Sequence, residues 1–260
     1  MTTMANQSYA CSVCGGATSF PTVMSTNAQG SVDLDLRPPE MQRSTMSTWV
    51  QTCPFCGFAA PAIDRPTGVT RAWLSFPEYA GLTEVTGDAP KASLPPLARE
   101  FFLAHKCHLA DGMIDQAIDN LICGAWDCDD AGEGAAGFAR NFRLLAADLM
   151  EQMLEELGKP GEGESPEDEQ KRQQVVLGIR LRSTDLLRRA RDFDRAAAQC
   201  SAAKRLLGAA DYDRTLMLVA AYEQHLIDAG DTACHTVREA IEAEATLKDI
   251  LHEIRRAIRS

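Results

Sequence analysis

Two cysteine pairs carry the clearest chemistry in this sequence. Cys11 and Cys14 are separated by two residues and followed by glycine, and Cys53 and Cys56 repeat that pattern. The spacing places two sulfurs one turn apart, and the glycine can adopt a positive φ where the chain folds back. Four thiolates brought together in this way suit a tetrahedral metal site with Zn–S bonds of ~2.3 Å.

Metal binding competes with two other interpretations, namely two disulfides or four unrelated thiols. The doubled Cys-x-x-Cys-Gly pattern favours the metal, and four protein ligands leave no open position for a substrate water. We therefore predict a structural site on Cys11, Cys14, Cys53 and Cys56. Because four thiolates accept either zinc or iron, Zn²⁺ is the predicted cofactor and Fe is the alternative.

The elements that must bring the two pairs together are predicted to be short strands. Apolar and β-branched residues recur over 18–26 and 45–52 without helical periodicity, which predicts strands there. The 38 residues between Cys14 and Cys53 exceed the ~15–20 of a compact ribbon, so they must form a loop or hairpin of their own. Within them, residues 31–37 alternate polar and apolar types and end at two prolines.

Proline and glycine punctuate the next stretch, which predicts a linker over 65–92. Four of its residues are interpreted as a buried strap between two domains: Trp73, Leu74, Phe76 and Tyr79. From Ser93, the predicted N-cap, the pattern becomes helical. Apolar stripes predict seven helices, near 93–109, 114–125, 138–153, 170–191, 194–207, 213–229 and 232–258.

The predicted fold is mostly α. A zinc-ribbon domain of short β-hairpins occupies 1–64, and an all-helical, tetratricopeptide-like domain follows the linker at 93–260. Glycines, prolines and acids at 158–168 predict an exposed, disordered acidic loop. The last helix has apolar residues at heptad spacing, interpreted as core with a dimer seam as the alternative: Leu247, Leu251, Ile254 and Ile258.

Two kinds of motif support a resemblance to known proteins. Residues 111–117 and 191–196 each precede a helix with recurring small residues, which resembles the second helix of tetratricopeptide units. Asp33-Leu-Asp-Leu, the stretch from Trp49 to Ala60, and Ala125-Trp-Asp-Cys-Asp follow in an order that resembles an uncharacterised bacterial family known only by a domain-of-unknown-function label. That resemblance covers residues 9–208. It implies a four-cysteine ribbon followed by tetratricopeptide-like helices, and no activity.

The cysteine pairs with their flanks also resemble the two halves of a rubredoxin. The matching stretches are Tyr9-Ala-Cys-Ser-Val-Cys-Gly and Trp49-Val-Gln-Thr-Cys-Pro-Phe-Cys-Gly. The resemblance implies one iron on four cysteines and a role in electron transfer. Gly16 stands where rubredoxins usually carry an aromatic residue, and the loop between the pairs differs from theirs.

Composition narrows the function classes. The net charge of −11 argues against a nucleic-acid binder, because phosphate contacts need a basic face. The polar stretch from Met1 to Ala10 lacks the apolar core of a signal peptide, and no run reaches the ~18 apolar residues of a membrane span. Nine cysteines in a long chain fit a reducing cytoplasm, which is the expected location.

Other constellations of polar residues are less convincing as sites. One resembles a second ligand set: His105, Cys107, His108, Cys123 and Cys128. A helix hairpin, with ~1.5 Å of rise per residue, would hold its members too far apart for metal bonds. A second group is interpreted as a solvated helix end, with a divalent-ion site as the weaker alternative: Asp127, Asp129 and Asp130. No phosphate loop, G-x-S-x-G or H-E-x-x-H motif occurs. The sequence therefore does not indicate an enzyme, and a site without these motifs stays open.

Charge is distributed unevenly along the helical part. Residues 148–170 hold nine acids and one base, whereas residues 171–205 hold ten bases and three acids. One interpretation is mutual neutralisation of neighbouring helices. The other is a basic surface for an acidic partner, formed by Arg180, Arg188 and Arg189, with the last two exposed. We predict a non-catalytic zinc-binding scaffold or adaptor for a protein or peptide, with a rubredoxin-like iron electron carrier as the alternative.

Overall fold

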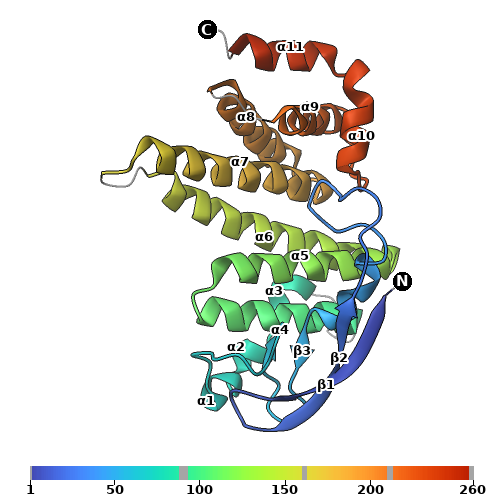
Figure 1. Ribbon diagram of the computed structural model, residues 1–260, viewed down its shortest axis with the longest axis vertical. Coiled ribbons are helices and arrows are strands. Elements are labelled where there is room, and N and C mark those ends of the chain that lie inside the picture. Colours follow the sequence, from blue (N-terminus) through green and yellow to red (C-terminus); the bar gives the residue numbers. More distant parts are fainter. Residues whose placement is uncertain (1, 88–92, 160–162, 210–212, 258–260) are drawn as a thin grey trace. The chain divides into compact units, whose positions relative to one another are not determined.

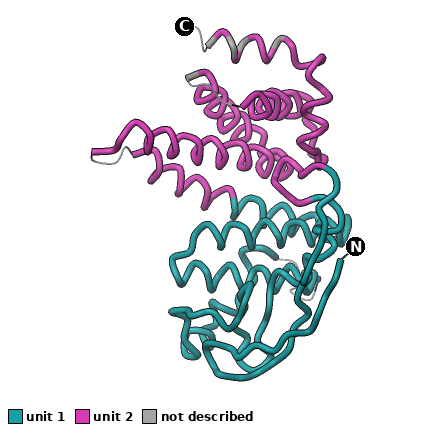
Figure 2. Tube along the Cα trace, in the orientation of Figure 1, with its two compact units in different colours: residues 1–30, 39–146 teal, residues 31–38, 147–260 magenta. Residues whose placement is uncertain are grey.

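The chain forms two compact units. The structure is a computed structural model that describes residues 2–87, 93–159, 163–209 and 213–257. One unit comprises residues 1–30 and 39–146, and the other comprises residues 31–38 and 147–260 (Figure 2). The first unit therefore contains residues from both sides of the predicted linker, and the second unit contains eight residues of the predicted ribbon. The predicted domain boundaries at 64 and 92 stay a prediction.

Two antiparallel hairpins of the first unit carry the cysteine pairs. Strand β1 (Thr3–Ala10) pairs with β2 (Ala17–Ser25), and β3 (Gln51–Thr52) pairs with β4 (Ala59–Ala60) (Figure 1). The strand predicted over 18–26 is confirmed by β2. The strand predicted over 45–52 is wrong for most of its length, because η1 (Arg43–Thr48) is a 3-10 helix and only Gln51–Thr52 is extended.

The other regular elements described in the first unit are helices. The short helices are α1 (Arg71–Leu74), α2 (Pro77–Ala80), α3 (Thr83–Thr86) and η3 (Glu133–Ala135). The long ones are α4 (Pro96–Ala110), α5 (Ile114–Asp130) and α6 (Ala136–Leu157), the last of which continues into the second unit. The predicted cap at Ser93 is wrong: the N-cap of α4 is Pro95, which provides no side-chain hydrogen bond. Proline at the first helical position costs little, since the amides there have no helical partner.

Helices α4 and α5 form an antiparallel pair against which α6 packs. Gly112, at φ +72°, turns the chain between α4 and α5. On α5, a Cβ at Gly124 would overlap the ring of Phe142 on α6, so only glycine permits this approach. The ring of Phe142 in turn meets Phe102 of α4 edge-on, with centroids 5.8 Å apart.

The regular elements described in the second unit are helices. Its helices are α7 (Pro166–Arg189), α8 (Phe193–Ala209), α9 (Arg214–Asp228), α10 (Val237–Glu242), η4 (Ala243–Ala245) and α11 (Lys248–Ala257). The single helix predicted over 232–258 is wrong, because Thr236 caps α10 with a capping box and η4 interrupts the chain. Leu247, Leu251 and Ile254 are buried in the core of this unit. Ile258 lies outside the described residues, as do residues 160–162 of the predicted acidic loop.

Residues 31–38, here called the docking segment, belong to the second unit although both their neighbours in sequence belong to the first (Figure 2). Leu34 is buried among apolar side chains of α7 to α11. The amide of Leu34 donates to the carbonyl of His235 at 2.9 Å, and the amide of Val237 donates to Val32 at 3.0 Å. Part of the predicted loop between the two cysteine pairs thus completes a helical core far along the chain.

The architecture confirms a mostly α protein with cysteine-bearing hairpins near its N-terminus. Within the part of the chain that the structure describes, no helix is both long enough and apolar enough to cross a bilayer.

Candidate metal centre

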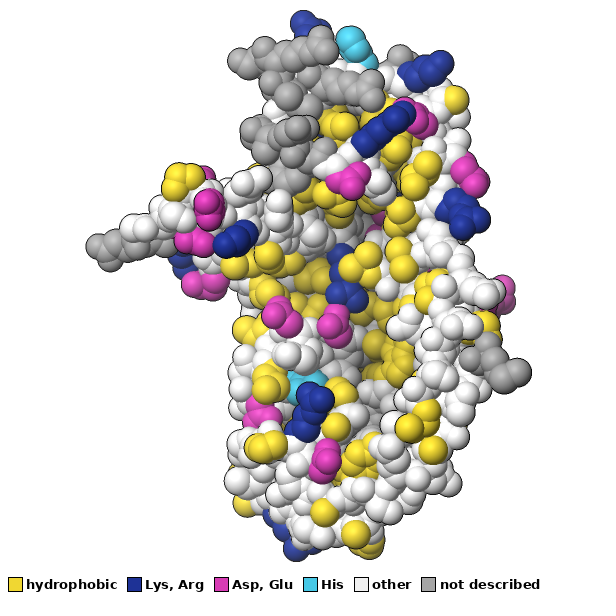
Figure 3. All heavy atoms as spheres, viewed as in Figure 1, with side chains coloured by type: hydrophobic (Ala, Val, Ile, Leu, Met, Phe, Trp, Pro, Cys, Tyr) yellow, Lys and Arg dark blue, Asp and Glu magenta, His cyan; other side chains and the backbone are white. Residues whose placement is uncertain are grey.

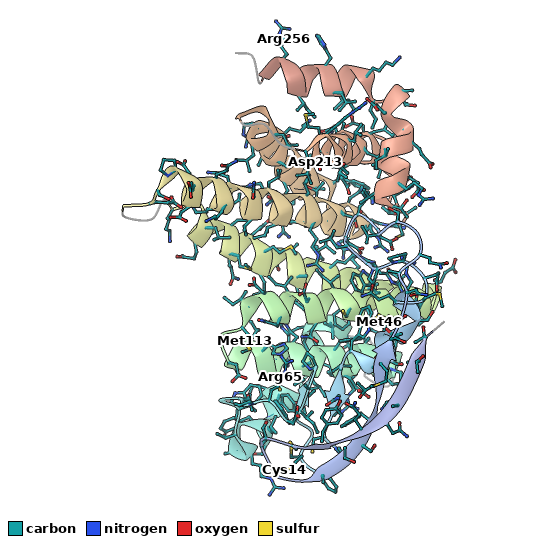
Figure 4. All side chains as sticks on the ribbon, in the orientation of Figure 1. Cys14, Met46, Arg65, Met113, Asp213 and Arg256 are labelled. Carbon is teal, nitrogen blue, oxygen red and sulfur yellow. The ribbon has the colours of Figure 1, made fainter. Side chains whose placement is uncertain are left out.

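The four predicted ligands converge at the tips of the two hairpins. All four Sγ atoms lie within 4.8 Å of one another, with Cys11 and Cys56 3.7 Å apart and Cys14 and Cys53 3.6 Å apart. Cys14 sits at the turn of the hairpin of β1 and β2 (Figure 4). A tetrahedron with metal–sulfur bonds of ~2.3 Å has edges of about 3.8 Å, so the sulfurs are spaced to hold one ion.

Each cysteine pair is held by the same backbone turn. The amide of Gly15 donates to the carbonyl of Cys11 at 2.8 Å, and the amide of Gly57 donates to Cys53 at 2.9 Å. Both glycines have positive φ, +72° and +78°, a conformation that other residues adopt only with strain. The glycine predicted to fold the chain back is therefore confirmed in both pairs.

The environment of the sulfurs favours a cation. The amide of Gly16 donates to Sγ of Cys14 at 3.4 Å and lowers the pKa of that thiol to about 7. Burial raises the pKa of Cys11 and of Cys56. Several thiolates cannot be held so close without a compensating positive charge, so a bound metal would complete the ionisation of the set.

Residues outside the cysteine pairs brace the hairpins. The amide of Ser12 donates to Ile63, and the hydroxyl of Tyr79 donates to the carbonyl of Gly57 at 2.5 Å. Tyr79 is buried, but Phe76 is 55% exposed, so the predicted strap is wrong in expecting all its aromatics to be buried. The hydrogen bond from Tyr79 to Gly57 could not be predicted from a local sequence pattern, since 22 residues separate the two.

A cavity of about 560 Å³ lies beside the centre. Cys56 and Tyr79 line it on the ribbon side, and Glu100 lines it from α4. Burial raises the pKa of Glu100, whose carboxylate accepts a hydrogen bond from the hydroxyl of Thr52 at 3.2 Å. Sequence reasoning missed this carboxyl. A metal ion held by the four cysteine sulfurs would have no open coordination position. The cavity therefore lies beside the metal site but would not give a ligand access to the ion.

The residues of the other constellations serve the helical core. Nδ1 of His105 donates to the carbonyl of Ala117 at 2.9 Å, and burial lowers the pKa of His105 to about 4. Asp127 accepts from the amide of Ala98 at 2.8 Å, and Asp129 pairs with Arg143. Among the described residues, the cysteine tetrad is the group of ligand atoms close enough to share a metal ion.

The arginines predicted to bind a partner are not an exposed set. Arg188 is completely buried between Asp185 and Glu223, and the side chain of Arg189 is 7% exposed and bonded to Asp35 at 2.7 Å. The expected exposure of both residues is therefore wrong, because Asp185 on the same helix and the distant Glu223 and Asp35 enclose them. Arg180 is half-buried and donates to Gln199 at 2.7 Å.

Ion pairs link the acidic stretch to the basic one. Arg195 of α8 contacts Asp148 at 2.7 Å and Glu151 at 2.9 Å on α6. Neighbouring helices thus neutralise one another, as the first interpretation of the charge pattern predicts. On the face drawn in Figure 3, acidic and basic side chains lie interspersed among hydrophobic ones.

Comparison with known proteins returned no match: no family model, no curated protein and no solved structure was similar enough to this chain.

Proposed function

We propose that this chain is a non-catalytic zinc-binding scaffold whose helices hold another protein. The closed donor set supports the first half of the proposal. All four ligands are cysteine sulfurs of the chain, so a tetrahedral ion keeps no position for substrate or water. The ion would hold two small hairpins together, which lack an extensive core of their own.

A groove on the first unit supports the second half. Its volume is about 550 Å³, and its apolar walls are Trp73 and Phe76 before α2 and Leu109 at the end of α4. Phe76 is 55% and Leu109 is 39% exposed. Exposed apolar side chains that gather around a concave surface are typical of sites for protein partners. This groove is the single observation that carries the binding role.

The charges around the groove indicate the chemistry of the occupant. The ammonium of Lys106 donates to the carbonyls of Glu78 and Gly81 at 2.6 and 2.7 Å and pairs with Glu84 at 3.3 Å. Its three protons are therefore used within the protein. The exposed carboxylate of Glu78 has no ion-pair partner in the described part of the chain, and Glu84 is half-exposed. The proposed partner is a segment with an apolar anchor next to lysine or arginine.

This proposal replaces the acidic partner expected from the arginines, since Arg188 and Arg189 are enclosed. It keeps the tetratricopeptide-like arrangement. The supporting observation is that α4 packs along α5 and α7 along α8, as successive helices of such arrays do.

Peptide selection tests the proposal. A random 12-residue peptide library panned on the metal-loaded protein should enrich apolar residues next to Lys or Arg, and a labelled selected peptide should bind in fluorescence anisotropy. Phe76→Asp should weaken its binding at least tenfold, and Glu78→Lys should reverse the charge preference. Ile241→Asp, at an exposed apolar residue of the second unit, is the matched control and should bind normally. If the selected peptide binds both groove variants as tightly as the wild type, the groove is not the binding site.

An iron electron carrier is the second candidate. The amide of Gly16 that donates to Sγ of Cys14 favours it, because hydrogen bonds to sulfur tune the potential of iron–sulfur sites. Protein purified from unsupplemented medium should decide between the metals. Stoichiometric iron with a red colour supports the carrier, whereas one colourless zinc per chain supports the scaffold.

A further inference from the structure

Three ionisable side chains meet in the interior of the second unit. Arg188 of α7 donates from Nε to Oε2 of Glu223 on α9 at 3.0 Å, and from Nη2 to Asp185. Each of the three is at most 2% exposed. One guanidinium thus stands between two carboxyl groups that water does not reach. Burying charge in this way is costly unless every charge and polar atom is compensated.

Glu223 is the less compensated of the two acids. Arg188 is its one ion-pair partner within the described residues, whereas Asp185 also lies 4.0 Å from Arg189. The second oxygen of Glu223, Oε1, is buried and accepts no hydrogen bond. An ionised carboxylate would leave that oxygen without a donor, at a cost of several kcal/mol. A protonated carboxyl supplies its own donor, and Asp185 is the acceptor within its reach.

The same cluster holds the docking segment in place. Nη1 of Arg188 donates to the carbonyls of Asp231 at 2.8 Å and Ala233 at 3.0 Å, which fixes the loop after α9. That loop continues into the backbone that pairs with Leu34 and Val32. The position of Arg188 therefore sets the position of the surface on which the docking segment lies.

We propose that Glu223 carries a proton in the folded protein and that this proton keeps the docking segment docked. Its ionisation would place a second negative charge beside Asp185, and Arg188, which contacts both acids, would have to compensate it. Water that enters the cluster would stabilise the added charge. The loop after α9 and the docking segment cover the cluster without being part of a helix, so we expect these two segments to move and admit the water. The proton is thus a latch that opens as pH rises.

The charged and titratable groups around Glu223 agree with this assignment. Burial raises the pKa of Glu223, and the charge of Asp185 raises it further. Burial raises the pKa of Asp185 as well. The other charged and titratable groups around the two acids come from five elements. They are Arg189 on α7, Cys200 on α8, Tyr222 on α9, Asp231 in the following loop and Asp35 in the docking segment. Arg189 contacts Asp185, whereas the cation that contacts Glu223 is Arg188.

Infrared spectroscopy tests the protonation. At neutral pH the protein should show the carbonyl stretch of a protonated carboxylic acid, and ¹³C labelling of glutamate should shift it. The band should be lost in Glu223→Gln and kept in Glu242→Gln, an exposed control on α10. Because labelling identifies the band in the wild type, the test survives a variant that fails to fold. Absence of a labelled protonated band at neutral pH would overturn the proposal.

Hydrogen exchange tests the latch. Protection of the Leu34 and Val237 amides, corrected for the intrinsic rate, should fall as pH rises through the ionisation of Glu223. The opening constant should increase by up to tenfold per pH unit, since one proton is released. Glu223→Gln should keep both amides protected over the same range. A wild type whose protection is independent of pH, or a Gln variant that opens in parallel with it, would show that the proton does not control docking.

Discussion

Gly16, which follows the Cys11–Gly15 turn, lies directly against the ring of Phe55, the residue between Cys53 and Cys56 in the other hairpin. A Cβ built on Gly16 would overlap that ring. The two hairpins therefore contact each other through more than their sulfurs. Phe55 is 60% exposed, so its ring can move outward when it is displaced.

Gly16→Ala should expel the ring of Phe55 and destabilise the metal-loaded ribbon by about 1 kcal/mol, since the ring loses its contact at little steric cost to the core. Competition with a chelator measures the change. A double-mutant cycle with Phe55→Ala provides the control: Gly16→Ala should cost less once the ring is absent, with a coupling of at least ~0.5 kcal/mol. Strict additivity would contradict the contact.

Removing a metal ligand should release the ion and unfold the ribbon. Serine at Cys53 or Cys56 should abolish stoichiometric metal in elemental analysis and disorder the two hairpins that carry the cysteines, because metal binding and folding are coupled at such sites. Most of the helical signal in circular dichroism should persist, since the helices have apolar cores of their own. Cys234→Ser, at an exposed thiol, should keep one ion per chain. Two ions per wild-type chain would contradict a single site.

Asp35→Ala should destabilise the second unit. Asp35 is fully buried and bonded to Arg189, so its removal leaves a buried guanidinium with a weaker partner. We expect a loss of about 2 to 4 kcal/mol in the free energy of unfolding, read from denaturant titration. Asp64→Ala removes the same charge from an exposed position and should change stability by less than ~0.5 kcal/mol. Equal effects of the two substitutions would show that docking through Asp35 adds nothing.

Acid should destabilise the first unit through His105. Its pKa in the folded protein, about 4, is lower than the ordinary value of 6.5, because burial disfavours the charged ring. The unfolded chain then binds more protons between these values, so stability falls as pH decreases from about 6.5 to about 4. The loss is on the order of 3 kcal/mol. His105→Gln should flatten the fall in melting temperature over this window, whereas exposed His225→Gln should not. Identical pH profiles for all three proteins would exclude His105.

Short-range patterns in the sequence were sufficient for the ligands and for most helices. The cysteine spacing and its glycine act within five residues, and the apolar stripes of α4 and α5 repeat within two turns. Helix ends were less predictable. Pro95 replaces Ser93 as a cap. The last predicted helix starts late, because Thr236 and Glu239 form a capping box, and η4 interrupts it after Glu242.

Long-range pairing explains what the sequence did not reveal. The arginine-rich pattern on α7 is the same whether its side chains face solvent or acids. Arg188 finds Glu223 35 residues away, and Arg189 finds Asp35 at a separation of 154 residues. No periodicity within α7 contains that information. The groove beside Phe76 was missed for a similar reason, since its walls come from the predicted linker and from α4.

The docking segment has a consequence for the order of events during synthesis. Asp35 precedes its partner Arg189 by 154 residues. At ~5–20 residues per second, the segment leaves the ribosome roughly 8 to 30 s before α7 is complete. The cysteine pairs on either side of it are already available by then, so an ion could close the nascent ribbon first. The second unit would then acquire its missing core residue from a chain segment already held at both ends, which lowers the entropy lost when that late, long-range contact forms.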